Sequence, residues 1–207
     1  LETMTWASAL LAVTSRIKVF STVHVPVFNP VVVAKMGATL DHISGGRWGV
    51  NLVSGWSEKE FGMMGIKLLP HEERYKRTEA FIKILIGLWS ETPGTFQHDS
   101  PWYQVKDGYS LPQPSNLPPI ANAGTSEDAK QMTSSLCDWA FISTPTIEAT
   151  AGIVSDITQR ASHAGRTVSC AAFPFVLWRD SEDEAQSELA KIIEHKDEVA
   201  AQNWLDG

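Results

Sequence analysis

The sequence predicts an α/β protein with a parallel sheet, and two observations favour this fold class. Short apolar runs alternate with longer amphipathic stretches five times, after one leading helical stretch. Alternation at this spacing indicates right-handed βαβ units, which build parallel sheets. The central run, Trp48–Val53, is short and mostly apolar, which is typical of a strand covered on both faces. A doubly wound sheet and part of a (β/α)8 barrel both fit this pattern.

The first half of the chain is organised around Asp41–Glu60. Gly45 and Gly46 are expected to end a helix, because the residue after a helix often needs a positive φ angle that glycine adopts freely. Pro30 suits the first turn of that helix. The expected elements are a helix over Glu2–Thr14, a strand over Ile17–Val25, a helix over Pro30–Ser44, the strand Trp48–Val53, a loop over Ser54–Pro70 and a helix over about Glu72–Ser90.

The second half begins with an aromatic excursion over Thr95–Pro119, in which Asp107-Gly108 predicts the turn of a β-hairpin. We expect this excursion to form an interface or a rim element. The remaining expected elements are a strand over Ile120–Ala123, a helix over Thr125–Leu136, a strand over Trp139–Ser143, a helix over Thr146–Gly165, a strand over Ser169–Trp178 and a helix from Ser181 to about Val199. Two pairs are spaced as capping boxes, Thr125 with Asp128 and Ser181 with Glu184.

Composition narrows the class of protein. A chain of 207 residues can bury one sizeable core, so a single domain over the whole chain is expected. The formal net charge of −7 argues against nucleic acid or an anionic membrane as partner. Cys137 and Cys170 lie far apart and outside any Cys-x-x-Cys pair, so both are expected to be reduced thiols of a cytoplasmic protein. The chain opens on Leu1 within a helical pattern, which predicts a fragment of a longer chain.

Two features of the sequence are compatible with a bound anion, a strand–helix junction at Gly124–Ser126 and a basic cluster with Arg74 at the start of a helix. Gly124, Thr125 and Ser126 lie between an expected strand and an expected helix, where free backbone N–H groups and the helix dipole favour a phosphate. Alternatively, Thr125 or Ser126 only caps the helix. Arg74 belongs to a basic cluster at a helix start, where the dipole disfavours cations. A bound anion or ion pairs with neighbouring glutamates would each explain that cluster.

Four further polar residues are candidates because of their positions. Thr22 and His24 lie near the end of their expected strand, the side on which a parallel sheet places its chemistry. Asn51 interrupts the apolar central strand, and a buried amide needs partners from the fold or from a ligand. Glu60 stands alone in a loop, where solvated surface is the ordinary outcome.

No metal site is expected. A zincin helix would need histidines at i and i+4, but the fourth residue after His71 is Tyr75. The sequence also holds no Walker loop and no Gly-x-Gly-x-x-Gly.

Three separated motifs resemble one family. The stretch Asn29–Glu60, the helix HEERYKRTEAFIKILIGLW and the junction ANAGTSEDA are similar to the bacterial-luciferase-like, FMN-dependent monooxygenases. The branch with the pyrimidine-ring-opening and dimethylsulfone monooxygenases is the most similar, and the likeness covers nearly the whole chain. The resemblance implies a (β/α)8 barrel that is incomplete here, with about five of eight strands, the first two and the last lying outside the sequence.

The resemblance also implies an activity. Family members take reduced FMN from an NAD(P)H-dependent flavin reductase and react it with O2, and the flavin–oxygen adduct oxidises or cleaves a small organic substrate. A homodimer or homotetramer is implied as well. At the matched positions the FMN contacts fall to Asn51, Glu60, Arg74, Tyr75 and the junction Gly124, Thr125 and Ser126.

The catalytic candidates follow from the same comparison. Thr22 and Asn51 match the polar pair beside the reactive edge of the flavin, and His24 is a third candidate on the same strand end. His24 stands where the pyrimidine enzyme has a small residue, so uracil is not the expected substrate. A deazaflavin (F420)-dependent dehydrogenase on the same fold and a non-catalytic flavin-binding remnant are the alternatives.

Overall fold

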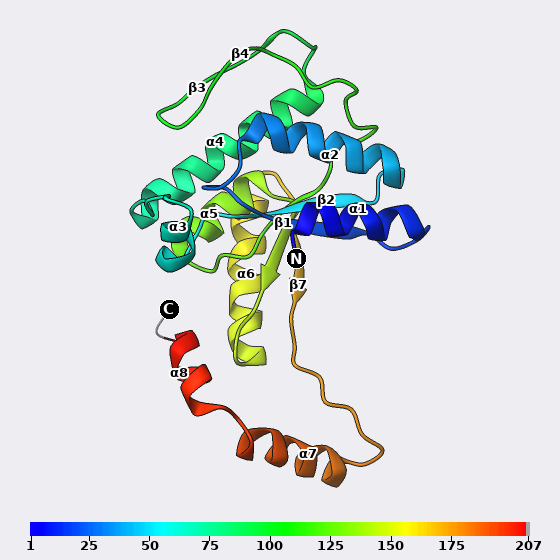
Figure 1. Ribbon diagram of the computed structural model, residues 1–207, viewed down its shortest axis with the longest axis vertical. Helices are drawn as coiled ribbons and strands as arrows, with labels where there is room; N and C mark the ends of the chain where they lie inside the picture. Colours follow the sequence, from blue (N-terminus) through cyan, green and yellow to red (C-terminus); the bar gives the residue numbers. More distant parts are fainter. Residues whose placement is uncertain (206–207) are drawn as a thin grey trace.

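The computed structural model describes residues 1–205 and is built on a five-stranded parallel sheet (Figure 1). The strands lie in the order β1-β2-β5-β6-β7, which confirms the parallel sheet expected from the alternating pattern. They are β1 (Val19–His24), β2 (Trp48–Val53), β5 (Ile120–Asn122), β6 (Trp139–Ile142) and β7 (Ser169–Ala172). The helices are α1 (Thr3–Val13), α2 (Pro30–Ser44), α3 (Glu58–Met63), α4 (His71–Ser90), α5 (Glu127–Leu136), α6 (Ile147–His163), α7 (Glu182–Glu194) and α8 (Glu198–Leu205).

The bounds of α2 and β2 match the sequence prediction. The side chain of Asn29 caps α2 by accepting the N–H of Val31 at 2.9 Å, and Pro30 occupies the first helical position. Gly45 ends the helix in the left-handed conformation at φ 64°, which a residue with a Cβ adopts only under strain. The chain can therefore turn directly into β2, which carries Asn51.

Arg47 fixes this turn to the start of the chain. Its guanidinium donates to the carbonyls of Leu11, Thr14, Ile17 and Ser44 at 2.8–2.9 Å. One side chain thus satisfies carbonyls at the C-terminal ends of both α1 and α2. The five-donor fork of arginine is suited to this task, whereas lysine offers a single nitrogen.

The main core lies between the sheet and the helices that cover one of its faces. Val23, Val50, Leu52 and Ile120 are buried on that face. The expected inward stripe of α4 is confirmed, with Ile86 half-buried and four of its residues fully buried, namely Thr78, Ile82, Leu85 and Trp89. Removing apolar surface of this kind from water stabilises the fold by about 25 cal/mol per Å².

A two-stranded hairpin of β3 (Phe96–Asp99) and β4 (Gln104–Gly108) lies over α2 and α4, on the side away from the sheet (Figure 1). The hairpin was expected, but the expected turn at Asp107-Gly108 is wrong. Asp99 pairs with Gln104, so the chain reverses over Ser100–Tyr103. Asp107 has a positive φ of 50° and lies within β4, facing a register shift between Phe96 and His98. The Asp-Gly pair therefore marks a bulge.

Two other local predictions need correction. The segment 54–70 is not only a loop, because the short helix α3 lies within it. The expected capping box of Thr125 with Asp128 is wrong by one residue, since Ser126 is the N-cap of α5 and accepts the N–H of Ala129 at 3.3 Å. Ser126 has the extended backbone that an N-cap requires.

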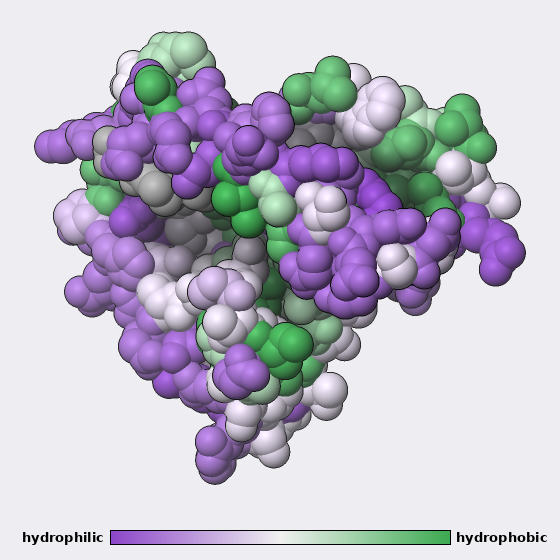
Figure 2. Space-filling model, turned by 90° about the horizontal axis from the view of Figure 1, so that it is seen from below, coloured by the Kyte–Doolittle hydropathy of each residue, from purple (hydrophilic) through white to green (hydrophobic). Residues whose placement is uncertain are grey.

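The C-terminal segment departs most from the expectation. β7 ends at Ala172, and Phe173, Phe175 and Trp178, which were expected to continue the strand, are exposed. Ser181 caps α7 as expected, but the helix stops at Glu194 and a separate α8 follows. No side chain of α7 is buried, and α7 and α8 lie apart from the sheet (Figure 1). Seen from the α7 end, hydrophobic patches alternate with hydrophilic ones (Figure 2).

The two thiols are free, in agreement with the sequence prediction. Cys137 is buried against the main core, and burial raises its pKa to about 12. Cys170 is half-buried, and burial raises its pKa as well. Separately, none of the helices within residues 1–205 is both long and apolar enough to cross a membrane.

Candidate functional site

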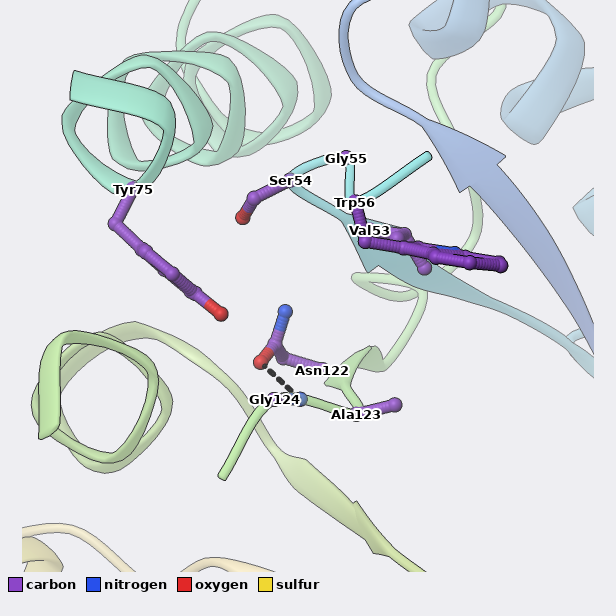
Figure 3. A pocket seen from close by; sticks show the side chains of 8 residues that line it. All are labelled: Val53, Ser54, Gly55, Trp56, Tyr75, Asn122, Ala123 and Gly124. Carbon is purple, nitrogen blue, oxygen red and sulfur yellow. Dashed lines mark hydrogen bonds between the residues drawn. The ribbon is translucent and has the colours of Figure 1, made fainter. Parts of the chain in front are cut away.

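A pocket of about 350 Å³ lies where β2 and β5 end, facing the first turns of α4 (Figure 3). Ligands of open parallel sheets and of (β/α)8 barrels bind at this carboxyl edge. The hydroxyl groups of Ser54 and Tyr75 point into the space between the elements (Figure 3). The pocket is lined by Val53, Ser54, Gly55, Trp56, Tyr75, Asn122, Ala123 and Gly124.

Gly124 forms a close contact that no other residue would allow. A Cβ atom at this position would lie 2.6 Å from the hydroxyl oxygen of Tyr75, 2.6 Å from the Cβ of Ala129 and 3.0 Å from Oδ1 of Asn122. The bare backbone of Gly124 therefore lies directly against the hydroxyl group of Tyr75, and the two residues together line one side of the pocket. We call Tyr75, Asn122, Gly124 and Ala129 the Gly124 cradle.

Arg74 brings a positive charge to the same edge. It lies in the first turn of α4, half-buried, and its Nη1 donates to the carbonyl oxygen of Gly55. Its Nε is buried and has no partner in the structure. An unpaired buried donor on a cation is costly, so this position favours a ligand that carries an acceptor.

Thr22 and Asn51 form a second polar group on the adjacent strands. They are register partners on β1 and β2, so both side chains lie on the face of the sheet opposite the main core. Nδ2 of Asn51 donates to Oγ1 of Thr22 at 3.2 Å. Oδ1 of Asn51 is buried without a partner, and the hydroxyl proton of Thr22 stays free to donate. The pair therefore offers one acceptor and one donor to a ligand.

His24 follows Thr22 by two residues and shares its face of the sheet. It is the register partner of Val53, the first residue of the pocket lining. Its ring packs edge-on against Phe61 of α3 with 5.9 Å between the ring centroids. Nδ1 of His24 is buried without a partner. The structure thus gathers Thr22, Asn51 and His24 at one end of two neighbouring strands.

The remaining candidates are less close to the pocket. Glu60 lies in α3 with its side chain exposed, and its backbone N–H donates to Oγ of Ser57 at 3.2 Å. Thr125 is exposed, and Ser126 uses its hydroxyl to cap α5. Of the junction, Gly124 alone lines the pocket.

Sequence reasoning missed Asn122, the residue that shapes the junction. Asn122 is 3% exposed, and its Nδ2 donates to the carbonyl of Leu52 at 2.7 Å while its Oδ1 accepts the N–H of Gly124 at 2.9 Å (Figure 3). It therefore ties the end of β5 to β2 and fixes the backbone at the cradle. The available signal was an amide in an otherwise apolar strand, the same signal that singled out Asn51.

Aromatic rings cover the same face of the sheet further along the strands. Phe20 of β1 packs edge-on against Phe141 of β6 at 5.2 Å and against Trp139 at 6.1 Å between ring centroids. Gly49 of β2 makes room for Phe20, because a Cβ there would lie 2.6 Å from its ring. The polar group of Thr22 and Asn51 therefore lies beside an apolar aromatic surface.

Histidine, cysteine and carboxylate side chains within residues 1–205 form no group of three that could hold a metal ion. The polar atoms available at the carboxyl edge are instead hydroxyl, amide, imidazole and guanidinium groups. Such a set suits an organic ligand with an anionic group.

The comparison with known families identifies the protein family to which this chain belongs. The family model described as luciferase-like monooxygenase matches residues 1–206. The chain belongs to this family.

The chain is 38% identical over 206 residues to an FMNH2-dependent dimethylsulfone monooxygenase from Pseudomonas fluorescens (strain Pf0-1), covering 99% of this chain and 56% of the relative. It is 33% identical over 214 residues to the pyrimidine monooxygenase RutA from Escherichia coli (strain SE11), covering 99% of this chain and 54% of the relative. The chain thus spans little more than half the length of these relatives.

Solved structures agree on the fold of this luciferase-like chain. The riboflavin lyase RcaE superposes with a TM-score of 0.85 at 23% identity, covering 94% of this chain and 49% of the other. DmoA from Hyphomicrobium sulfonivorans superposes with a TM-score of 0.81 at 24% identity, covering 95% of this chain and 48% of the other. At this identity the likeness bears on the fold alone, and it fits the expectation of a luciferase-like barrel seen in part.

Proposed function

We propose that this chain carries the flavin site of an FMNH2-dependent monooxygenase that oxidises or cleaves a small organic substrate. The observation that carries the proposal is the meeting of two polar groups at one sheet edge, Arg74 with the Gly124 cradle and Thr22 with Asn51. Each group keeps a buried polar atom without a protein partner, Nε of Arg74 and Oδ1 of Asn51. Family membership and the FMNH2-dependent relative support reduced FMN as the ligand.

The first group fits the phosphate end of FMN. Arg74 supplies a half-buried positive charge, and the first turns of α4 and α5 add the positive ends of two helix dipoles. The absence of a side chain at Gly124 leaves room for the hydroxyl of Tyr75 at the edge of the pocket, where this hydroxyl can contact a ligand. We therefore assign Arg74, Tyr75, Gly124 and Ser126 to the phosphate and ribityl chain. Thr125 and Glu60 are kept as outer contacts of the same cofactor.

The second group fits the reactive end. Reduced FMN together with O2 supplies an activated oxygen atom for transfer to the substrate. Thr22 would donate and Asn51 would accept at that position, so they hold a small oxygen species without presenting a nucleophile. His24, next along β1, would orient the substrate. The aromatic surface of Phe20 and Trp139 keeps water away from the reacting atoms.

Several features of the whole protein are proposed on the family alone. They are a separate NAD(P)H-dependent flavin reductase, a homodimer or homotetramer, a cytoplasmic location and a single barrel domain to which the whole chain belongs. The hairpin of β3 and β4 is the proposed rim or subunit contact, since Tyr109 directly after it is 58% exposed.

The test is oxygen-dependent turnover. The full native polypeptide that carries this sequence is mixed anaerobically with photoreduced FMN, exposed to O2 with a panel that includes dimethylsulfone and uracil, and assayed for oxygenated product by mass spectrometry. Incorporation of one atom of ¹⁸O from labelled O2 into a product is the expected result. Tight binding of reduced FMN without any oxygenated product would instead favour the non-catalytic alternative. Preferential binding of the deazaflavin F420 would favour the dehydrogenase alternative.

A further inference from the structure

His71 and Asp128 join the first turns of α4 and α5. Nδ1 of His71 lies 3.0 Å from a carboxylate oxygen of Asp128, and the two side chains are 48% and 42% exposed. Within the part of the chain that the structure describes, no other hydrogen bond or ion pair joins these two helices. The contact therefore bridges the two helix ends that flank the pocket.

Both partners of this contact lie next to a wall of the Gly124 cradle. The ring of His71 packs on the ring of Tyr75, one helical turn further along α4, with 5.0 Å between their centroids. Asp128 directly precedes Ala129, whose Cβ would lie 2.6 Å from a Cβ at Gly124. A change in the distance between His71 and Asp128 would thus move Tyr75 relative to Gly124.

We propose that His71 is a positioning residue for the cofactor phosphate. Its hydrogen bond to Asp128 sets the spacing of α4 and α5, and this spacing sets how closely Tyr75 approaches Gly124. His71 itself needs no contact with the ligand. The inference rests on the proposed function, because it takes the phosphate end of FMN to lie in the pocket against the Gly124 cradle.

If His71 only stabilised the fold, its loss would loosen the site and weaken the binding of both flavins alike. Exposed pairs of this kind contribute little to folding stability, so we expect the urea midpoint to stay nearly unchanged when the pair is removed. A positioning role predicts a larger change in the affinity for FMN than in the affinity for riboflavin, which keeps the ribityl chain but lacks the phosphate. The comparison of the two flavins therefore separates positioning from a general loosening of the site.

The experiment compares His71→Asn with His71→Phe in the full native polypeptide. The side-chain amide of Asn can place a donor where Nδ1 of His71 lies, whereas Phe keeps the ring contact with Tyr75 and removes the hydrogen bond. Dissociation constants for photoreduced FMN and riboflavin are measured under anaerobic conditions. We expect His71→Phe to weaken FMN binding roughly threefold, the scale of one exposed pair. His71→Asn should bind FMN nearly as the wild type does, and in His71→Phe the affinity for riboflavin should change less than the affinity for FMN.

A second background tests the partner. In an Asp128→Ala chain, the difference in FMN affinity between His71→Asn and His71→Phe should disappear, because the group that receives the hydrogen bond is absent. The inference is overturned if His71→Phe binds FMN as the wild type does, if it loses both flavins equally, or if the difference persists without Asp128. Failure of the wild type to bind reduced FMN at all would overturn the proposed function together with this inference.

Discussion

Asn51 donates its side-chain N–H to the hydroxyl of Thr22 across two parallel strands, at 3.2 Å, and leaves its own carbonyl oxygen buried without a partner. The side-chain N–H of Asn51 thus bonds within the fold, while its carbonyl oxygen stays available to a ligand. The proposed function depends on this division, because Thr22 is left with a free hydroxyl proton beside the free acceptor.

Replacing Thr22 by Val tests that pair. Valine has nearly the same shape but no hydroxyl, so we expect flavin binding to persist. Oxygenated product should fall about tenfold, the effect of one lost hydrogen bond of about 1–1.5 kcal/mol in the transition state. Hydrogen peroxide released per FMNH2 consumed should rise in parallel. A variant with unchanged product and peroxide yields would remove Thr22 from the reacting centre.

Gly124→Ala tests the cradle. The added Cβ would meet both Tyr75 and Ala129 at 2.6 Å, so we expect a loss of FMN affinity, with an overpacking cost of about 1–3 kcal/mol. Gly152→Ala is the matched control, because a Cβ on that exposed position of α6 has no neighbour within 4 Å. Alanine is favoured over glycine in a helix by about 1 kcal/mol, so the control should be as stable as the wild type or more stable, with unchanged binding. Equal FMN affinity in both variants would speak against the cradle.

Arg47→Lys tests how the first helix is attached. Lysine keeps the charge but cannot reach the carbonyls of Leu11, Thr14, Ile17 and Ser44 together, so we expect the free energy of unfolding to fall by about 2 kcal/mol. Urea denaturation followed by circular dichroism measures the change. The same substitution at Arg16, which is exposed, should have almost no effect. A stable Arg47→Lys chain would mean that burial of α1 alone holds it in place.

A pH dependence is expected from the ion pairs of Asp156 on α6, one with Arg160 of the same helix and one with Lys130 of α5. Arg160, at 2.6 Å, and Lys130, at 2.5 Å, lower the pKa of Asp156 below its ordinary value of 3.8. A carboxylate with a lowered pKa stabilises the fold above its unfolded pKa, and this contribution is lost as the pH falls through the folded pKa. Asp156→Asn should therefore lower the urea midpoint near pH 7, and its difference from the wild type should shrink toward about pH 3. A difference that is constant with pH would show that the pairs contribute nothing.

The parts of the fold that were predictable are those with local causes. Pro30, Gly45 and the apolar run of β2 fix their elements through backbone geometry and periodicity, and the structure has them at the expected residues. The turn predicted at Asp107-Gly108 is wrong because a positive φ angle occurs both in hairpin turns and in bulges. Only the pairing of β3 with β4 decides between the two. The segment 173–178 has strand-like composition, but only Phe173 still bonds to β6, and none of the other five residues belongs to a strand of the described sheet.

The candidate site was predictable only in part, for a similar reason. Sequence reasoning can place Tyr75 and Gly124 near the starts of α4 and α5, but it cannot place one beside the other, since that depends on how α4 packs against α5. Asn122 escaped notice because its role is to bond Leu52 of another strand. The bond of Asn51 to Thr22 likewise exists only through the register of β1 with β2.

The central claim is that Arg74 and the Gly124 cradle hold reduced FMN by its phosphate. The most direct measurement is an anaerobic titration of photoreduced FMN and of riboflavin into the full native polypeptide and its Arg74→Gln variant. We predict that the wild type binds FMN more tightly than riboflavin, and that Arg74→Gln loses this preference while its riboflavin affinity is unchanged. Equal binding of the two flavins by the wild type, or an intact preference in Arg74→Gln, would contradict the account.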